Sequence, residues 1–210
     1  MWDGFDLPGA VRHELRGFGD TPLPESGTFS DADELEERLG DEPSALVGAS
    51  FGGQVCLEVA ARRPELVTEL VVLDARLPDH AWSDEILAYE AEEERLVEEG
   101  DLDAATELNV HFWAPSVAER VRPMQRRSFE LMVGSAAEDV QPDRIDLAAI
   151  GARMLVVVGE LDKADFRAIA ERLAAEIADA ELVVMEGVTH LPALERPDET
   201  ARLVREFLAR

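Results

Sequence analysis

Short apolar runs rich in β-branched residues alternate along the chain with longer segments of mixed polarity. Runs of four to eight apolar residues bounded by turn residues predict strands that are buried on both faces. We expect strands at 10–15, 44–47, 69–73, 154–158 and 181–185. Helical patterns separate most of these runs, so the sequence predicts an α/β fold with a mostly parallel sheet covered by helices on both sides.

The segments between the strands carry apolar residues at three- and four-residue spacing, which predicts helices. The clearest helix is expected at about 163–178, where one face gathers Phe166, Ile169, Ala170, Leu173, Ala174 and Ile177. Further helices are expected at 30–39, with Ser30 as the N-cap, at 51–63, and after Pro197. The helix at about 163–178 must pack its apolar face on another apolar surface.

The strand pattern disappears between Ala75 and Ile150, and helix-prone stretches take its place at 83–100, 102–113 and 117–134. A helical segment inserted between two strands of a parallel sheet reads as a cap over the carboxyl edge of that sheet. The expected organisation is therefore a core formed by 1–74 and 151–210, with a helical cap at 75–150.

Composition narrows the classes of function. The chain has 210 residues and 46% of them are hydrophobic, which favours one domain with an insertion. No apolar run approaches the roughly 20 residues of a membrane span and no signal segment is seen, so a cytoplasmic protein is expected. The net charge of −26, from 46 acidic and 20 basic residues, argues against nucleic acid and membrane surfaces as partners. Cys56, the single cysteine, excludes an internal disulfide and a thiolate metal cluster, and we expect it to be a buried packing residue.

One motif carries the pattern of a nucleophile. A strand leads directly into a sharp turn, and a helix begins at once, in the stretch Gly48-Ala49-Ser50-Phe51-Gly52-Gly53. Strand, turn and helix in this order form a nucleophile elbow, where the serine hydroxyl projects above the sheet and the helix N-terminus faces developing negative charge. The flanking glycines fit because neighbouring backbones come too close for a Cβ. Ser50 is the candidate nucleophile.

A serine needs a base, and the base needs an acid that fixes its tautomer. His190 follows the last predicted strand and is the best placed of the four histidines, since His13 falls within a strand before the elbow and His80 and His111 fall in the predicted cap. Asp162 lies just beyond the strand at 154–158 and is the favoured acid. Asp74 ends the preceding strand and is the rival, because it gives the same order of serine, acid and histidine.

These landmarks, together with Leu15-Arg16-Gly17-Phe18-Gly19 and with Glu195-Arg196-Pro197 after His190, resemble those of capped α/β-hydrolases over nearly the whole chain. The resemblance implies a Ser50, Asp162, His190 triad, the backbone N–H of Phe51 as one oxyanion donor, and no metal or organic cofactor. The most similar groups are small bacterial esterases, enol-lactonases and carbon–carbon bond hydrolases. The expected substrate is a small carboxylic ester or lactone, with carbon–carbon bond hydrolysis, or a non-catalytic remnant, as alternatives.

The chain departs from that family pattern at its start. A strand ending in a His-Gly type motif would precede the segment Trp2-Asp3-Gly4-Phe5 and would donate the second oxyanion amide, which we therefore expect to be missing from this chain. A strand between those at 10–15 and 44–47 would also be missing, leaving a gap in the sheet that would favour a homodimer. We expect Met1 to be an internal methionine of a longer protein, in preference to a gap filled by another segment or chain, or an inactive remnant.

Large side chains of the predicted cap are candidates for a substrate pocket between cap and sheet. An apolar or aromatic acyl group would suit a pocket formed by Trp82, Trp113, Met124, Phe129 and Met132. The same side chains could instead form the cap's own core. The sequence leaves both interpretations open.

Overall fold

The computed structural model describes residues 2, 5, 7 and 9–210. They form two compact units. Unit 1 contains Ala32–His80, Gln141–Arg210 and the described residues up to Val11, and unit 2 contains Arg12–Asp31 and Ala81–Val140. No helix formed by the described residues is both long and apolar enough to cross a membrane.

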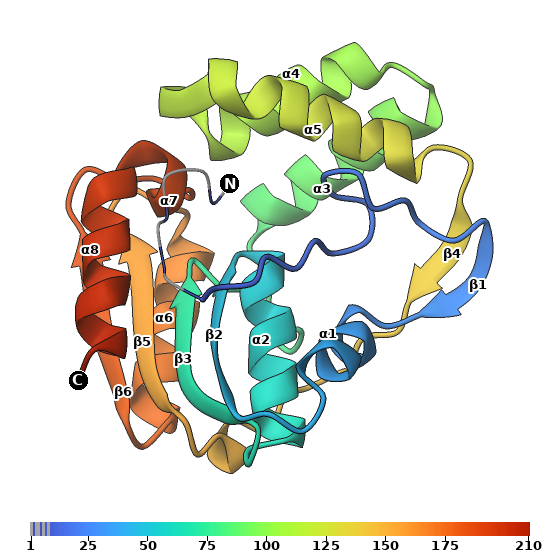
Figure 1. The fold of residues 1–210 in the computed structure, drawn as a ribbon. Coiled ribbons are helices and arrows are strands. Elements are labelled where there is room, and N and C mark those ends of the chain that lie inside the picture. The colour runs from blue at the N-terminus through green and yellow to red at the C-terminus, as the bar shows by residue number, and fades with distance from the viewer. Residues whose placement is uncertain (1, 3–4, 6, 8) are drawn as a thin grey trace. The chain divides into compact units, whose positions relative to one another are not determined.

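Unit 1 is built on a four-stranded parallel sheet in the order β2-β3-β5-β6 (Figure 1). Its strands are β2 (Ser44–Ala49), β3 (Val67–Leu73), β5 (Arg153–Gly159) and β6 (Ala180–Met185). The two central strands are almost continuously buried, because parallel sheets carry helices on both faces. All four strands match runs that the sequence predicted.

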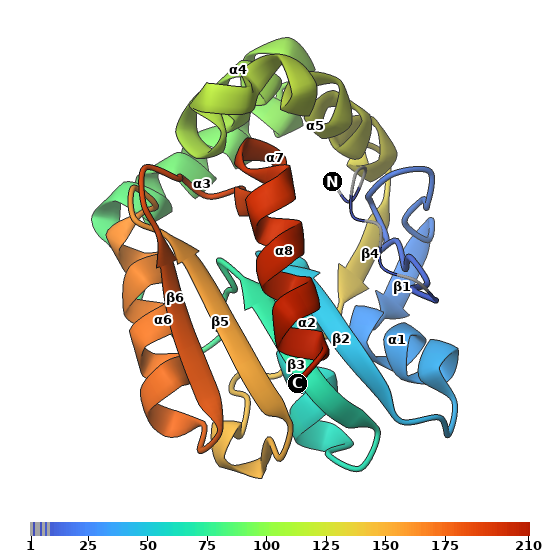
Figure 2. The ribbon, with the colours of Figure 1, turned by 60° about the vertical axis from the view of Figure 1, so that its left-hand side comes forward.

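Helices cover both faces of this sheet. On one face lies α8 (Pro197–Leu208), and on the other lie α2 (Phe51–Arg62) and α6 (Ala164–Glu176) (Figure 2). The face under α8 forms a core cluster that includes Val71, Leu73, Leu155, Val157, Ala201, Val204 and Phe207. Alternate residues of β3 and β5 meet the apolar stripe of α8 there, as strand and helix periodicities require. Unit 1 also contains α1 (Asp31–Leu39), the short α7 (Pro192–Glu195) and the 3₁₀ turn η2 (Leu147–Ala149).

The strand expected at 10–15 is absent, and that prediction was wrong. These residues are irregular, and Val11 is 67% exposed. A strand satisfies its backbone groups by pairing, and no strand among the described residues pairs with 10–15. Arg12, His13 and Glu14 stand in the middle of this segment, so it has little apolar surface to bury.

Unit 2 contains the three helices expected from the pattern, α3 (Asp84–Glu98), α4 (Leu102–Trp113) and α5 (Ala118–Met132), with the 3₁₀ turn η1 (Pro115–Val117). It also contains a small parallel pair that the pattern did not reveal, β1 (Ser26–Phe29) with β4 (Ala136–Asp139). These strands have four residues each and are largely exposed, so they carry no apolar run that could have predicted them. The helices α4 and α5 pack against each other, as do α3 and α4.

Candidate active site

Ser50 occupies a strained turn between β2 and α2. Its φ of 50° lies in the left-handed region, which a non-glycine residue adopts at a cost of about 1–3 kcal/mol. The turn is tight because a Cβ at Gly48 would overlap the backbone of Gly52, and would lie 2.8 Å from Sγ of Cys56. The N–H of Gly53 donates to the Ser50 carbonyl at 3.0 Å and so holds the turn. The end of β3 also supports the elbow, because the N–H of Ser50 donates to the Leu73 carbonyl at 2.8 Å.

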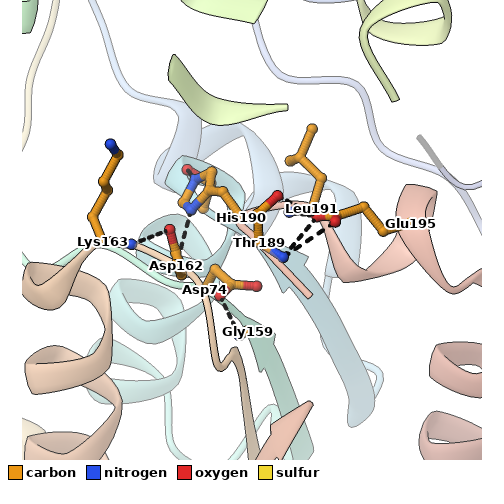
Figure 3. Close-up of polar contacts among 9 residues, drawn as sticks. Asp74, Gly159, Asp162, Lys163, Thr189, His190, Leu191 and Glu195 are labelled. Atoms are coloured by element: carbon orange, nitrogen blue, oxygen red, sulfur yellow. Dashed lines mark hydrogen bonds and ion pairs between the residues drawn. The ribbon is translucent and has the colours of Figure 1, made fainter. Parts of the chain in front are cut away.

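Ser50, His190 and Asp162 come together through two hydrogen bonds. Nε2 of His190 lies 3.0 Å from Oγ of Ser50, and Nδ1 of His190 lies 2.9 Å from Oδ2 of Asp162. Ser50 follows β2, Asp162 follows β5 and His190 follows β6, so all three side chains lie at the carboxyl edge of the sheet. Figure 3 shows Asp162 beside His190. A carboxylate at Nδ1 requires the proton there, which leaves Nε2 free to accept the serine proton. The geometry is that of a nucleophile with a general base and a positioned acid.

Both partners of Ser50 are almost fully buried. His190 and Asp162 are each 6% exposed. The ring of Phe166, on α6, meets the imidazole edge to face with centroids 4.4 Å apart. The backbone N–H of Lys163 donates to Oδ1 of Asp162 at 2.7 Å, so both carboxylate oxygens are engaged. Burial in a low-dielectric setting strengthens these charge-assisted bonds.

The loop that carries His190 is held by a carboxylate that the sequence did not assign a role. Glu195, at the end of α7, accepts the backbone N–H groups of Thr189 and Leu191 at 3.1 Å and the Thr189 hydroxyl at 2.7 Å (Figure 3). One side chain thereby grips the residues on either side of the histidine. The motif Glu195-Arg196-Pro197 marked the position, but nothing in the spacing revealed which backbone groups the glutamate would bind.

Asp74, the rival acid, lies beside this group without binding the histidine in the same way. It follows β3, adopts a φ of 46°, and is 1% exposed. Its Oδ1 accepts the backbone N–H of Gly159 at 2.9 Å. Burial, and then the neighbouring Asp162, raise the pKa of Asp74 well above the usual range of an aspartate.

Asp74, Asp162 and His190 each offer one potential metal-ligand atom, and these atoms lie within 4.8 Å of one another. The hydrogen bond between His190 and Asp162 already uses one nitrogen and one oxygen of the set. A cation bound through those atoms would have to break it. We therefore interpret the cluster as a hydrogen-bonded group.

The backbone N–H of Phe51 belongs to the first turn of α2, whose amides have no carbonyl partner within the helix. Its role as one oxyanion donor stays a prediction. In the family pattern the second oxyanion donor comes before the segment Trp2-Asp3-Gly4-Phe5, and it was expected to be missing from this chain. Asp3 and Gly4 of that segment lie outside the described residues.

Comparisons with known proteins agree with this geometry. A family model described as the alpha/beta hydrolase family matches residues 3–203, nearly the whole chain. The chain belongs to the α/β hydrolase family. Its sheet order, its elbow and the positions of the three side chains at strand ends all fit that fold.

Individual relatives have low sequence identity to this chain but align over most of its length. The 2-hydroxymuconate semialdehyde hydrolase of Pseudomonas putida is 28% identical over 214 residues, covering 95% of this chain and 76% of that protein. The pimeloyl-[acyl-carrier protein] methyl ester esterase of Nitrosospira multiformis is 27% identical, and the match covers 95% of this chain and 81% of that protein.

Solved structures give the same fold. A thermophilic esterase from Thermogutta terrifontis matches with a TM-score of 0.72 at 27% identity, covering 93% of this chain and 78% of that one. The enol-lactonase from Burkholderia xenovorans LB400 matches with a TM-score of 0.70 over 94% of this chain and 79% of that one, and at 21% identity it shows the fold alone.

Other residues singled out in the sequence have structural partners. His80 belongs to unit 1 and not to the helical unit, and its Nε2 lies 3.0 Å from Oδ1 of Asp165. Burial raises the pKa of Cys56 to about 12, so this residue stays a thiol at neutral pH, as expected for a packing residue.

The five candidate pocket residues all belong to unit 2. Phe129 is 3% exposed and forms a cluster with Leu96 and Ala105, against which Met132 packs. Trp113 meets Tyr89 edge to face at 5.3 Å. Met124 is 42% exposed and Trp82 is half-buried. Phe129 thus contributes to the core of its own unit, and a pocket role for this set stays a prediction.

At Gly159 the end of β5, which leads to Asp162, approaches the loop that carries His190 very closely. Replacement of Gly159 by alanine tests this close approach. A Cβ there would overlap the carbonyl oxygens of Thr189 and Val188, and neither is the end of a flexible side chain. We expect Gly159→Ala to lower the free energy of unfolding by about 3 kcal/mol. We also expect a fall of at least about 100-fold in any activity that depends on Asp162 and His190, because a displacement near 1 Å of groups that act in a reaction has that effect.

Denaturant unfolding and ester kinetics measure the two effects of Gly159→Ala. Gly151→Ala is the matched control, because no atom lies within 4 Å of a Cβ at Gly151. An unfolding curve of Gly159→Ala that coincides with the curve of the control would contradict the close approach of the loops.

Proposed function

We propose that this α/β hydrolase is a serine hydrolase that acts on a small carboxylic ester or lactone through an acyl-enzyme. Ser50 Oγ attacks the carbonyl carbon while Nε2 of His190 takes its proton. The same nitrogen then protonates the leaving alcohol, and water, activated by His190, releases the acid and regenerates Ser50. Asp162 keeps the proton on Nδ1 and stabilises the imidazolium that forms.

The observation that carries this proposal is the unbroken line of hydrogen bonds from Ser50 through His190 to Asp162, at 3.0 and 2.9 Å. A packing role for the motif would need neither bond. The strained φ of Ser50 adds support, since strain of this kind persists where the surroundings hold it and clusters at active sites. The Phe51 amide would stabilise the oxyanion from the helix N-terminus.

The names of relatives support a carbonyl substrate. One is named as a methyl ester esterase, and one structural neighbour, at 27% identity, as an esterase. The first relative described above is named for a semialdehyde, 2-hydroxymuconate semialdehyde, which makes hydrolysis of such a compound the second candidate function. A panel of p-nitrophenyl esters, lactones and 2-hydroxymuconate semialdehyde separates the two by which compounds give measurable kcat/KM.

A fluorophosphonate probe tests the proposed nucleophile directly. We expect the probe to label the native protein at Ser50, because it reacts with serines that an adjacent base activates. Peptide mass mapping locates the label. Ser50→Ala should abolish labelling, whereas Ser26→Ala, at an exposed serine of β1, should leave it intact. A folded protein that takes up no label would contradict the proposal.

A further inference from the structure

Asp74 is a buried carboxyl group that the proposed reaction does not use. It is 1% exposed at the end of β3, directly beside the proposed triad acid (Figure 3). Its left-handed backbone, with φ at 46°, aims the side chain into the interior at a cost in strain. A packing role alone could be filled by an apolar side chain without burying a charge.

The two oxygens of Asp74 differ in their surroundings. Oδ1 accepts the Gly159 N–H at 2.9 Å. Oδ2 is buried and has no hydrogen-bond donor in the part of the chain that the structure describes. An ionised carboxylate would leave this oxygen as a bare buried charge, which costs several kcal/mol.

The surrounding ionisable groups are nearly all acidic. Asp162, from the loop after β5, and Glu195, from α7, both repel a charge on Asp74, and His190 lies in the same cluster. Two buried carboxyl groups at this separation do not both ionise readily. Of these two carboxyl groups, the one that accepts fewer hydrogen bonds is the one that keeps its proton. Asp162 accepts N–H groups from Lys163 and His190, one on each oxygen, whereas Asp74 accepts one N–H in total among the described residues.

We propose that Asp74 is protonated at neutral pH and donates a hydrogen bond from Oδ2 to the carboxylate of Asp162, as a positioning residue for the triad. This inference rests on the proposed function. The donated bond holds the Asp162 carboxylate in addition to its bonds from His190 and Lys163, and it draws off part of the negative charge. Asp162 then stabilises the His190 imidazolium less strongly, and the base becomes active at lower pH.

Infrared spectroscopy tests the proton on Asp74 without any reference to activity. A protonated carboxylic acid gives a C=O stretching band that carboxylates lack. We expect the wild-type protein at pH 7 to show such a band, and the isosteric Asp74→Asn to lose it. Asparagine tolerates the left-handed backbone, so this variant should fold. Absence of the band in the wild type would overturn the proposal.

Stability gives a second test that is independent of activity. Above the ordinary pKa of an aspartate, near 3.9, the unfolded chain loses a proton that native Asp74 retains, so the free energy of unfolding falls as the pH rises. Asp74→Asn has no such proton, so its free energy of unfolding does not fall for this reason. The difference in free energy of unfolding, variant minus wild type, should therefore increase between about pH 4 and about pH 7. A relative stability that stays constant or decreases over this range would show that Asp74 is ionised in the native state.

The direction of a pH shift then tests the hydrogen bond itself. We expect Asp74→Ala, which removes the donor, to move the acid limb of kcat/KM upward by about one pH unit relative to Asp74→Asn, whose amide still donates. If Asp74 were ionised, both variants would remove a charge near His190 and both limbs would move downward from wild type. An Asp74→Ala limb at or below that of Asp74→Asn would overturn the donation.

The proposed function and this inference fail in distinguishable ways. A protein that is neither labelled by the fluorophosphonate nor active on the substrate panel contradicts the function. The infrared band and the stability comparison still report on Asp74 in that case. The downfield ¹H NMR signal of the His190 Nδ1 proton, followed with pH in both variants, then replaces the kinetic profile.

Discussion

His190→Gln is expected to lower kcat for ester hydrolysis by about 10⁶-fold. The imidazole is the group that both removes the Ser50 proton and returns it to the leaving alcohol, with Nε2 3.0 Å from Oγ. Glutamine fills much of the same volume but cannot take up a proton. Steady-state kinetics with a p-nitrophenyl ester, supported by circular dichroism to verify folding, measures the effect.

The control for this substitution is a histidine away from the site. His111 is an exposed residue of α4, so His111→Gln should change kcat less than about twofold. A His190→Gln variant that keeps more than about one hundredth of wild-type kcat would contradict the assignment of the base. The base would then have to be sought in another group.

Asp162→Asn is expected to lower kcat by about 10⁴-fold. The Asp162 carboxylate accepts the Nδ1 proton of His190 at 2.9 Å and so keeps Nε2 unprotonated toward Ser50. An amide can turn its NH₂ toward Nδ1, which favours the wrong tautomer, and it brings no charge to stabilise the imidazolium. Asparagine has nearly the same size as aspartate and its amide oxygen can still accept the Lys163 N–H, so we expect the variant to fold with this defect confined to the site.

Asp74→Asn is the comparison that shows which aspartate acts as the triad acid, because both aspartates lie beyond strand ends at the carboxyl edge of the sheet. The amide at position 74 can still accept from Gly159 and donate to Asp162, so we expect a loss of at most about tenfold. A 10⁴-fold loss for Asp74→Asn with a small loss for Asp162→Asn would reverse the assignment. Comparable large losses in both would indicate that the pair acts as one acid.

Much of the sheet could be predicted because its strands are apolar runs, and the two central strands, β3 and β5, are almost continuously buried. The apolar runs of β2, β3, β5 and β6 carry that burial in their composition. The strand expected at 10–15 was not found, since an apolar run specifies burial but cannot supply a pairing partner. The pair β1 and β4 was missed for the converse reason, because short exposed strands are held by backbone pairing with little apolar signal.

By itself the sequence determined the nucleophile elbow. Strand, turn and helix are adjacent in the chain, and Gly48 is required by a contact within a few residues, with the backbone of Gly52, whereas a Cβ at Gly53 would meet Ala75, which follows β3. The sequence also predicted that Ser50, Asp162 and His190 lie at the same edge of the sheet. Each follows a predicted strand, and the carboxyl ends of parallel strands meet at one edge.

Only the tertiary structure decided between Asp74 and Asp162 as the residue bonded to His190. Both end neighbouring strands, and strand order cannot tell which side chain reaches Nδ1. The choice depends on the direction of each carboxyl group, which is set by the Gly159 amide for Asp74 and by the Lys163 amide for Asp162. The grip of Glu195 on the histidine loop was equally hidden, because its partners are backbone groups whose positions exist only once the chain has folded.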